Sequence, residues 1–164
     1  SYHKRDMDNA NSAILVNILP QDFACNKFMN NSSDLHEESP LNGIKFQEYF
    51  EEKAFKAGGG NYFAPVQYLG SFLGEKATGN FSDTVPSYMP GIKENSFEEI
   101  LPSFILESLK LAFPIFNNKI NGFSSPGAVI TGIESRSSSP VRILRDERLK
   151  ICLDSDYFLK FTRV

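Results

Sequence analysis

The sequence predicts an α+β fold, a mixed domain with about three helices and a small sheet. Apolar residues recur at helical spacing between residues 44 and 122, whereas β-branched residues alternate within residues 128–164. A length of 164 residues with 41% hydrophobic residues suits one domain with a sizeable core. We therefore expect a single domain over residues 1–164, with an exposed loop at 26–43, a helical part at 44–122 and a strand-rich part at 128–164.

The first expected element is a buried strand. The apolar run of residues 13–16 continues through Ile18 and Leu19 and is stopped by Pro20. Its short length and β-branched content favour a strand over a helix. The following stretch, residues 26–43, is rich in Asn, Ser and acidic residues and therefore predicts an exposed loop.

The clearest helix signal lies in "GIKFQEYFEEKAFKAGGG". Its apolar positions fall on one face: Phe46, Tyr49, Phe50, Ala54 and Ala57. Glu51, Glu52 and Lys56 fall on the opposite face. Asn42 can cap the start, and Gly58 can end the helix in the left-handed conformation.

A second, shorter helix is expected to start at Pro65 and to stop near Gly74, because proline suits a first helical position. Residues 78–92 contain two prolines and two glycines and predict an extended connection.

The third helix is expected from about Pro102 to Ala112. Ser96 followed by Glu99 forms a capping box ahead of it. Pro114 is expected to interrupt the helix, and a loop is expected around Gly122.

Strands are expected over residues 128–135 and 140–144, with a turn or an irregular connection at 136–139. Residues 151–164 could form a further strand pair.

Composition excludes several classes of protein. A net charge of -3 argues against a nucleic-acid partner, and the arginines are concentrated between Arg136 and Arg148. Two distant cysteines favour a reducing cytoplasm over a disulfide framework. No apolar run is long enough for a membrane span, and no signal-peptide segment is visible. The chain begins with Ser1, which suggests an excised piece of a longer protein.

Several familiar sites are poorly supported. The glycine triplet at 58–60 follows a helix instead of opening one, so it does not predict a dinucleotide loop. Two histidines and two cysteines without ligand spacing predict no metal site. No GxSxG elbow supports a serine hydrolase. Paired carboxylates such as Glu51 and Glu52 are expected on solvated surfaces.

The stretch "GIESRSSSPVRILRD" has two interpretations. Arg136 and Arg142 flank serines that could add donors to a phosphate or a carboxylate, and Pro140 stiffens the entry to a strand. Alternatively, these arginines form salt bridges with acids such as Asp146 and Glu147 in a hairpin.

Asn9, Asn11 and Ser12 precede the first expected strand. Side chains at the mouth of a strand often meet ligands in α/β folds. Capping and turn formation explain Asn and Ser equally well.

Four motifs together resemble the bacterial FAD-dependent dehydrogenases, a family also described as NAD(FAD)-utilising dehydrogenases. They are "RDMDNANSAILVNILPQDF", "KAFKAGGGNYFAPVQYLGSFL", "PSYMPGI" with "FEEILPSFILESL", and "GIESRSSSPVRILRDE". The resemblance covers residues 5–147 in order.

The resemblance implies that this chain is the middle of a longer enzyme, an insertion or cap domain without the Rossmann dinucleotide motif. Its partner would be the FAD-binding domain of the parent chain, which would hold FAD. We expect the isolated chain to retain no FAD. The implied cofactor-binding residues are Arg5, Asn9, Asn11, Ser12, Glu134, Arg136, Ser138, Ser139 and Arg142.

The expected function is therefore the substrate-side domain of an FAD-dependent oxidoreductase, inactive by itself. The parent would transfer electrons between a nicotinamide cofactor and an unassigned small molecule. No catalytic residue is assigned. The alternative is a non-enzymatic binding module that uses residues 134–145 to dock an anionic partner.

Overall fold

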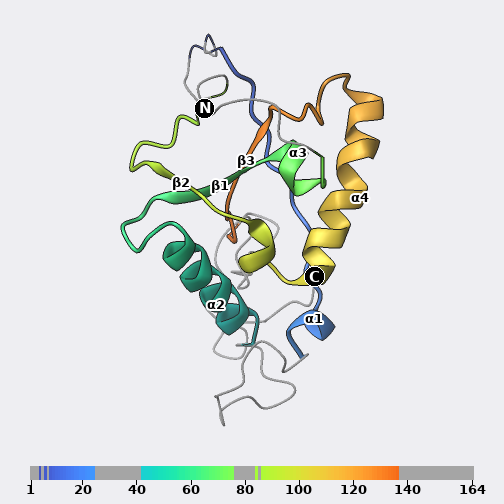
Figure 1. Cartoon of the computed structure of the whole chain (residues 1–164). Helices are drawn as coiled ribbons and strands as arrows, with labels where there is room; N and C mark the ends of the chain where they lie inside the picture. Colours follow the sequence, from blue (N-terminus) through green and yellow to red (C-terminus); the bar gives the residue numbers. More distant parts are fainter. Residues whose placement is uncertain are drawn as a thin grey trace, which may run out of the picture. The chain divides into compact units, whose positions relative to one another are not determined.

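The computed structural model of the chain describes residues 4, 6, 8–24, 42–75, 84 and 86–136 (Figure 1). In order, the elements are α1 (Pro20–Ala24), α2 (Asn42–Ala57), β1 (Ala64–Tyr68), α3 (Leu69–Phe72), β2 (Ile92–Glu94), the 3₁₀ helix η2 (Phe97–Glu99), α4 (Ser103–Lys119) and β3 (Val129–Thr131). These helices and the small mixed sheet confirm the α+β fold class.

The described residues fall into two compact units. One lies within residues 1–17 and 50–133, and the other lies within residues 18–49 and 134–164. The first unit contains the sheet and the main hydrophobic core. The division into one domain with three parts stays a prediction.

The sheet has the order β2-β1-β3, as Figure 1 shows. Strand β1 pairs in parallel with β2, where Ala64 lies opposite Ile92, and antiparallel with β3, where Val66 lies opposite Thr131. Because β1 is the central strand, all five of its residues are buried. A buried central strand needs apolar or hydrogen-bonded side chains on both faces.

The helix expected from Pro65 was therefore a wrong prediction. Residues 65–68 belong to β1, and the helix α3 begins only at Leu69. The carbonyl of Pro65 accepts a hydrogen bond from the Gly132 N–H at 3.2 Å, so this proline takes part in the sheet as an acceptor. The strands β1 and β2 both lie inside the part that was expected to be helical, 44–122.

The core of the first unit joins α2, α3, η2 and α4. Its buried members are Ala54, Leu69, Phe72, Phe97, Ile100, Leu106 and Phe113. The rings of Phe72 and Phe113 meet edge to face with centroids 5.9 Å apart. Full burial of each large apolar side chain stabilises the fold by about 1.5–3 kcal/mol.

Helix α2 confirms the clearest helix prediction. Phe46, Phe50 and Ala54 are buried, whereas Glu52 and Lys56 are exposed. The helix includes Asn42 and Gly43, so the expected loop ends before them. Residues 26–41, the rest of that loop, lie outside the described residues.

The end of α2 differs from the prediction in one respect. Gly59, with a φ of 98°, takes the left-handed conformation that was expected at Gly58. Gly58 is required for another reason, because a Cβ there would lie 1.9 Å from the carbonyl oxygen of Phe63. The chain thus turns closely on itself between α2 and β1.

Helix α4 is longer than expected. It begins after Pro102 and continues past Ala112 to Lys119, with Pro114 inside it. Proline in a helix interior costs about 3 kcal/mol because a hydrogen-bond donor is lost. Burial of the adjacent Phe113, which is 4% exposed, offsets much of that cost.

The expected capping box forms only in part. The Ser96 Oγ accepts a hydrogen bond from the Glu98 N–H at 3.2 Å and caps η2. The N–H of Ser96 itself donates to the Asn95 Oδ1 at 2.7 Å. Asn95 therefore has the role that the motif assigned to Glu99.

The strand expected over residues 13–16 was also a wrong prediction. Residues 10–19 have no helix or strand assignment, although their burial alternates: Ile14 and Val16 are half-buried, whereas Leu15 is 57% exposed. Ile14 packs against the core of the first unit. Extended chain with one apolar face imitates the sequence pattern of a strand. Pro20 begins the short helix α1.

Strand β3 confirms the strand expected within residues 128–135. The strands expected at 140–144 and 151–164 lie outside the described residues, as do residues 137–139 of the expected connection; Arg136, its first residue, has no helix or strand assignment.

Candidate functional site

The candidate site residues form two groups, one near each end of the chain. The N-terminal group comprises Asn9, Asn11 and Ser12, all exposed in the irregular segment that precedes Ile14. Ile14 anchors this segment on the hydrophobic core of the first unit. The amides and the hydroxyl therefore sit at the surface of that unit, where they can meet a polar ligand.

The C-terminal group follows β3. Gly132 fixes the exit from this strand, because a Cβ there would lie 2.4 Å from the Phe97 ring. Ile133 then packs against the core. The chain reaches Glu134 and Arg136 two and four residues after Gly132, and both side chains are exposed.

The second unit holds part of this group in place. The Ser135 carbonyl accepts a hydrogen bond from the Gln47 Nε2 at 2.8 Å. Gln47 lies on the first half of α2 and is half-buried. This bond fixes the backbone between Glu134 and Arg136.

The donor chemistry of both groups suits an anion. Carboxamide and guanidinium N–H groups bind phosphate oxygens, and a guanidinium can do so with two parallel hydrogen bonds. Asn9, Asn11 and Arg136 carry donors of this kind, whereas the Glu134 carboxylate can only accept hydrogen bonds. The N-terminal group lies in the first unit, and Glu134 and Arg136 lie in the second. Arg5, Ser138, Ser139 and Arg142 lie outside the described residues, as do Asp146 and Glu147.

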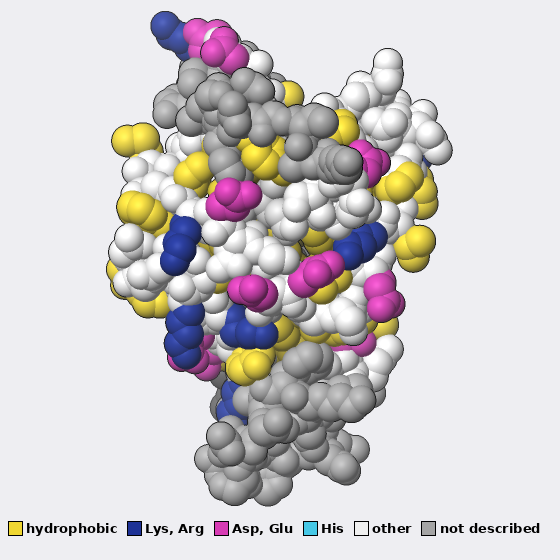
Figure 2. Space-filling model, in the orientation of Figure 1, with side chains coloured by type: hydrophobic (Ala, Val, Ile, Leu, Met, Phe, Trp, Pro, Cys, Tyr) yellow, Lys and Arg dark blue, Asp and Glu magenta, His cyan; other side chains and the backbone are white. Residues whose placement is uncertain are grey.

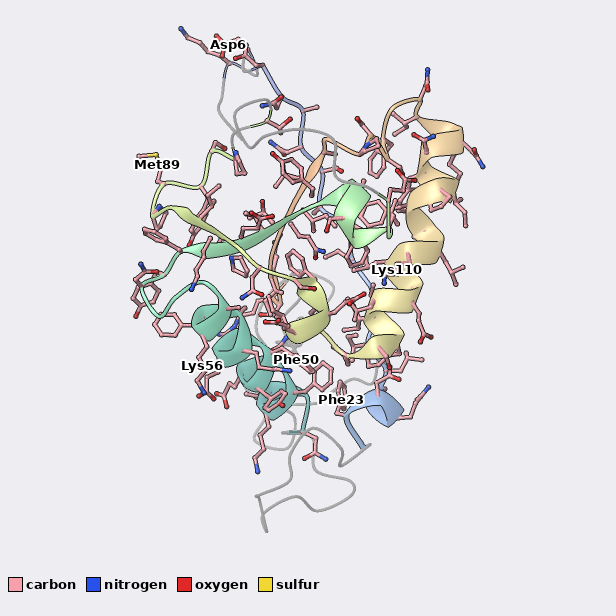
Figure 3. All side chains as sticks on the ribbon, viewed as in Figure 1. Asp6, Phe23, Phe50, Lys56, Met89 and Lys110 are labelled. Atoms are coloured by element: carbon pink, nitrogen blue, oxygen red, sulfur yellow. The ribbon has the colours of Figure 1, made fainter. Side chains whose placement is uncertain are left out.

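Of the paired carboxylates, Glu52, Glu98 and Glu99 are exposed as expected, whereas Glu51 is half-buried. Glu52 forms an exposed ion pair with Lys56. Glu98 Oε1 lies 2.8 Å from the Lys110 Nζ, and Figure 3 shows the Lys110 side chain on α4 beside η2. The same ammonium lies 5.4 Å from the centroid of the Phe72 ring. The first pair joins neighbouring turns of α2, and the second joins η2 to α4.

Two polar side chains of the first unit, the buried Gln67 and the half-buried Asn95, hold neighbouring elements together, a role that the sequence did not reveal. Gln67 of β1 is 8% exposed, and its Oε1 accepts the Phe97 N–H at 2.9 Å. Asn95 donates through its Nδ2 to the Ala57 carbonyl at 3.3 Å. The Gln67 bond connects β1 to η2. The Asn95 bond connects the segment just before η2 to the last residue of α2. The β-prone run around Val66 and Tyr68 was the signal that could have identified the strand.

The described ranges offer neither a metal centre nor a membrane span. Within them, no group of three or more His, Cys, Asp or Glu side chains could hold a metal ion. No helix in that part of the chain is long and apolar enough to cross a membrane.

Comparison with known proteins identifies the family of the chain. A family model described as "FAD-dependent protein, C-terminal domain-like" matches residues 1–137. A protein of Clostridium beijerinckii, itself described as uncharacterised, is 41% identical over 155 residues. That alignment covers 93% of this chain and 27% of the relative. The chain thus spans about a quarter of the length of the relative that it matches.

Proposed function

Because the chain belongs to the family described as FAD-dependent protein, C-terminal domain-like, we propose that it is the substrate-side domain of an FAD-dependent oxidoreductase. The match over residues 1–137 is the observation that carries the proposal. The alignment with 27% of a longer relative supports a place within a larger polypeptide. The remainder of that polypeptide would hold the Rossmann-type domain and most of the FAD site.

The position within the parent stays a prediction. The family description names a C-terminal domain, whereas the motif resemblance implies an insertion in the middle of the chain. In either position, residues 134–136 would approach the flavin or its substrate with Arg136 as the cationic group. FAD supplies hydride and electron transfer when it is bound, and this domain binds and orients what lies next to it.

The two groups of residues would contribute different interactions with the ligand. The exposed Asn9, Asn11 and Ser12 would donate hydrogen bonds to polar atoms of the ligand. Arg136 would stabilise negative charge on a phosphate or on the reduced flavin. A nicotinamide cofactor and an unassigned acceptor would exchange electrons through the parent enzyme, which we place in the cytoplasm.

Substitution of Arg136 tests the proposal. In the full-length gene product, Arg136→Ala is expected to weaken flavin or substrate binding by about 1–3 kcal/mol, because a charge-assisted hydrogen bond is lost. Flavin fluorescence titration of the apoprotein and the KM for substrate measure the effect. Lys119→Ala, which removes another exposed cation, is the matched control and should leave both values unchanged.

The opposing result is equally concrete. If Arg136→Ala lowers the stability of the protein and leaves flavin and substrate affinity intact, the arginine serves a salt-bridged hairpin. The interpretation of residues 134–145 as a ligand-facing segment would then be wrong.

A further inference from the structure

Helix α4 is apolar on two opposite faces. Leu106 and Phe113 are buried against the core. On the opposite face of the helix, Leu111 is 71% exposed and Ile115, one turn later, is 55% exposed. Ile120, which follows the helix with an extended backbone, is 59% exposed. We call Leu111, Ile115 and Ile120 the α4 stripe. Neighbouring exposed aliphatic side chains on the outward face of a helix mark a candidate contact surface.

Leu111 and Ile115 lie in the second half of the outward face, where Asn118 and Lys119 are also exposed. One turn before Leu111, the same face carries Glu107 and Ser108, which are exposed and polar. Figure 2 shows hydrophobic side chains along the edge of the molecule where α4 lies in Figure 1. The change from polar to apolar within one helix face marks a bounded surface.

The size of the stripe favours one kind of occupant. Three aliphatic side chains expose a few hundred Å² at most. A stable complex between separate proteins buries about 800 Å² on each partner. A segment of the same polypeptide can dock on a smaller patch, because covalent linkage raises its effective concentration.

The chain comparison supplies such a segment. The aligned region makes up 27% of the relative from Clostridium beijerinckii, so nearly three quarters of that polypeptide lies outside it. We infer that the α4 stripe is the surface on which the remainder of the parent polypeptide packs. The inference rests on the part of the proposed function that places this chain in a longer protein. The docking surface must be aliphatic or aromatic at its centre, since a buried unpaired charge there would be strongly destabilising.

Variants of the full-length protein test this inference. Leu111→Glu is expected to lower the first thermal unfolding midpoint by about 4–10 °C, because the carboxylate would be buried at the interface. Ser108→Glu is the matched control, since it adds the same charge to the polar half of the same face. It should shift the midpoint by no more than about 2 °C. Equal midpoints for the two variants would overturn the inference.

A milder variant covers the case in which Leu111→Glu does not fold. Leu111→Ala keeps the helix propensity and truncates only the side chain. We expect its midpoint to fall by about 2–6 °C if Leu111 is packed. An unchanged midpoint would show that Leu111 faces water in the full-length protein, which would overturn the inference.

Two further readouts separate the possible occupants and the two proposals. Light scattering reports the oligomeric state, and a dimer that Leu111→Glu dissociates would assign the stripe to a second copy and overturn the inference. Flavin absorbance of the same samples tests the proposed function separately. A colourless wild type with the expected Leu111→Glu shift would retain the docking surface and reject the flavin proposal. A yellow wild type without that shift would support the flavin proposal and overturn the docking surface.

Discussion

Glycines at close backbone approaches are the residues on which the local structure depends most. Gly58, just after α2, lies against the carbonyl of Phe63, the residue before β1. Gly132, just after β3, lies against the Phe97 ring. The triplet at 58–60 was correctly predicted to end a helix. The sequence could not show which of these glycines is fixed by space and which by its dihedral angles, because both demands select the same residue.

Gly58→Ala is expected to destabilise the chain by about 1–3 kcal/mol or more, because the new Cβ would overlap the Phe63 carbonyl oxygen. Urea denaturation measures the change. Gly43→Ala, also in α2, meets only ordinary contact with the Phe23 ring at 3.5 Å. It should be neutral or stabilising by up to about 1 kcal/mol. A reversed order of the two variants would contradict the geometry at Gly58.

Gln67 allows a second test at the scale of one residue. Gln67→Leu leaves the buried Phe97 N–H without its acceptor at 2.9 Å, so we expect a loss of about 1–3 kcal/mol. Ser71→Ala removes only the longer contact of 3.5 Å to the Gln67 Nε2 and should cost less than about 0.5 kcal/mol. Similar losses in both variants would indicate that the Gln67 Nε2 group, and not its Oε1 acceptor, provides the stabilisation.

At the scale of elements, the sequence predicted helices and strands best where the spacing of apolar residues matches the face that is buried. Helix α2 has one apolar face, and that face is the buried one. Strand β1 was mistaken for a helix because a central strand buries both faces and shows no alternation. The segment before α1 shows the converse, since Ile14 and Val16 alternate with exposed neighbours without belonging to a strand.

Pro114 was expected to end the third helix, and its neighbours explain why it does not. Phe113 is buried, and the side chain of Ser124 donates to the Phe113 carbonyl at 2.7 Å, which anchors this part of α4. Tertiary contacts thus override a local helix-breaking preference.

Pro114→Ala should therefore stabilise the chain by about 1–3 kcal/mol, because the missing N–H donor is restored. Chemical denaturation provides the measurement. Ser108→Ala, at another exposed position of α4, should gain only about 0.5 kcal/mol from helix propensity. If Pro114→Ala unfolds more easily than the wild type, the proline contributes packing that outweighs its lost hydrogen bond.

For the whole molecule, four short sequence motifs were enough to suggest a flavoprotein family, and the family match agrees with an FAD-dependent protein. The site could be predicted only as two groups of donors, because a ligand pocket depends on how distant segments meet. Asn9 and Arg136 are both exposed, each in its own unit, and their role in ligand binding stays a prediction. The apolar α4 stripe points to the same dependence on additional polypeptide.

The flavin content of the full-length gene product tests the central claim most directly. The protein would be purified, denatured, and its released cofactor measured by absorbance and identified by mass. The proposal predicts about one FAD for each polypeptide. A folded full-length protein that releases no flavin, and takes up none when FAD is added, would contradict it.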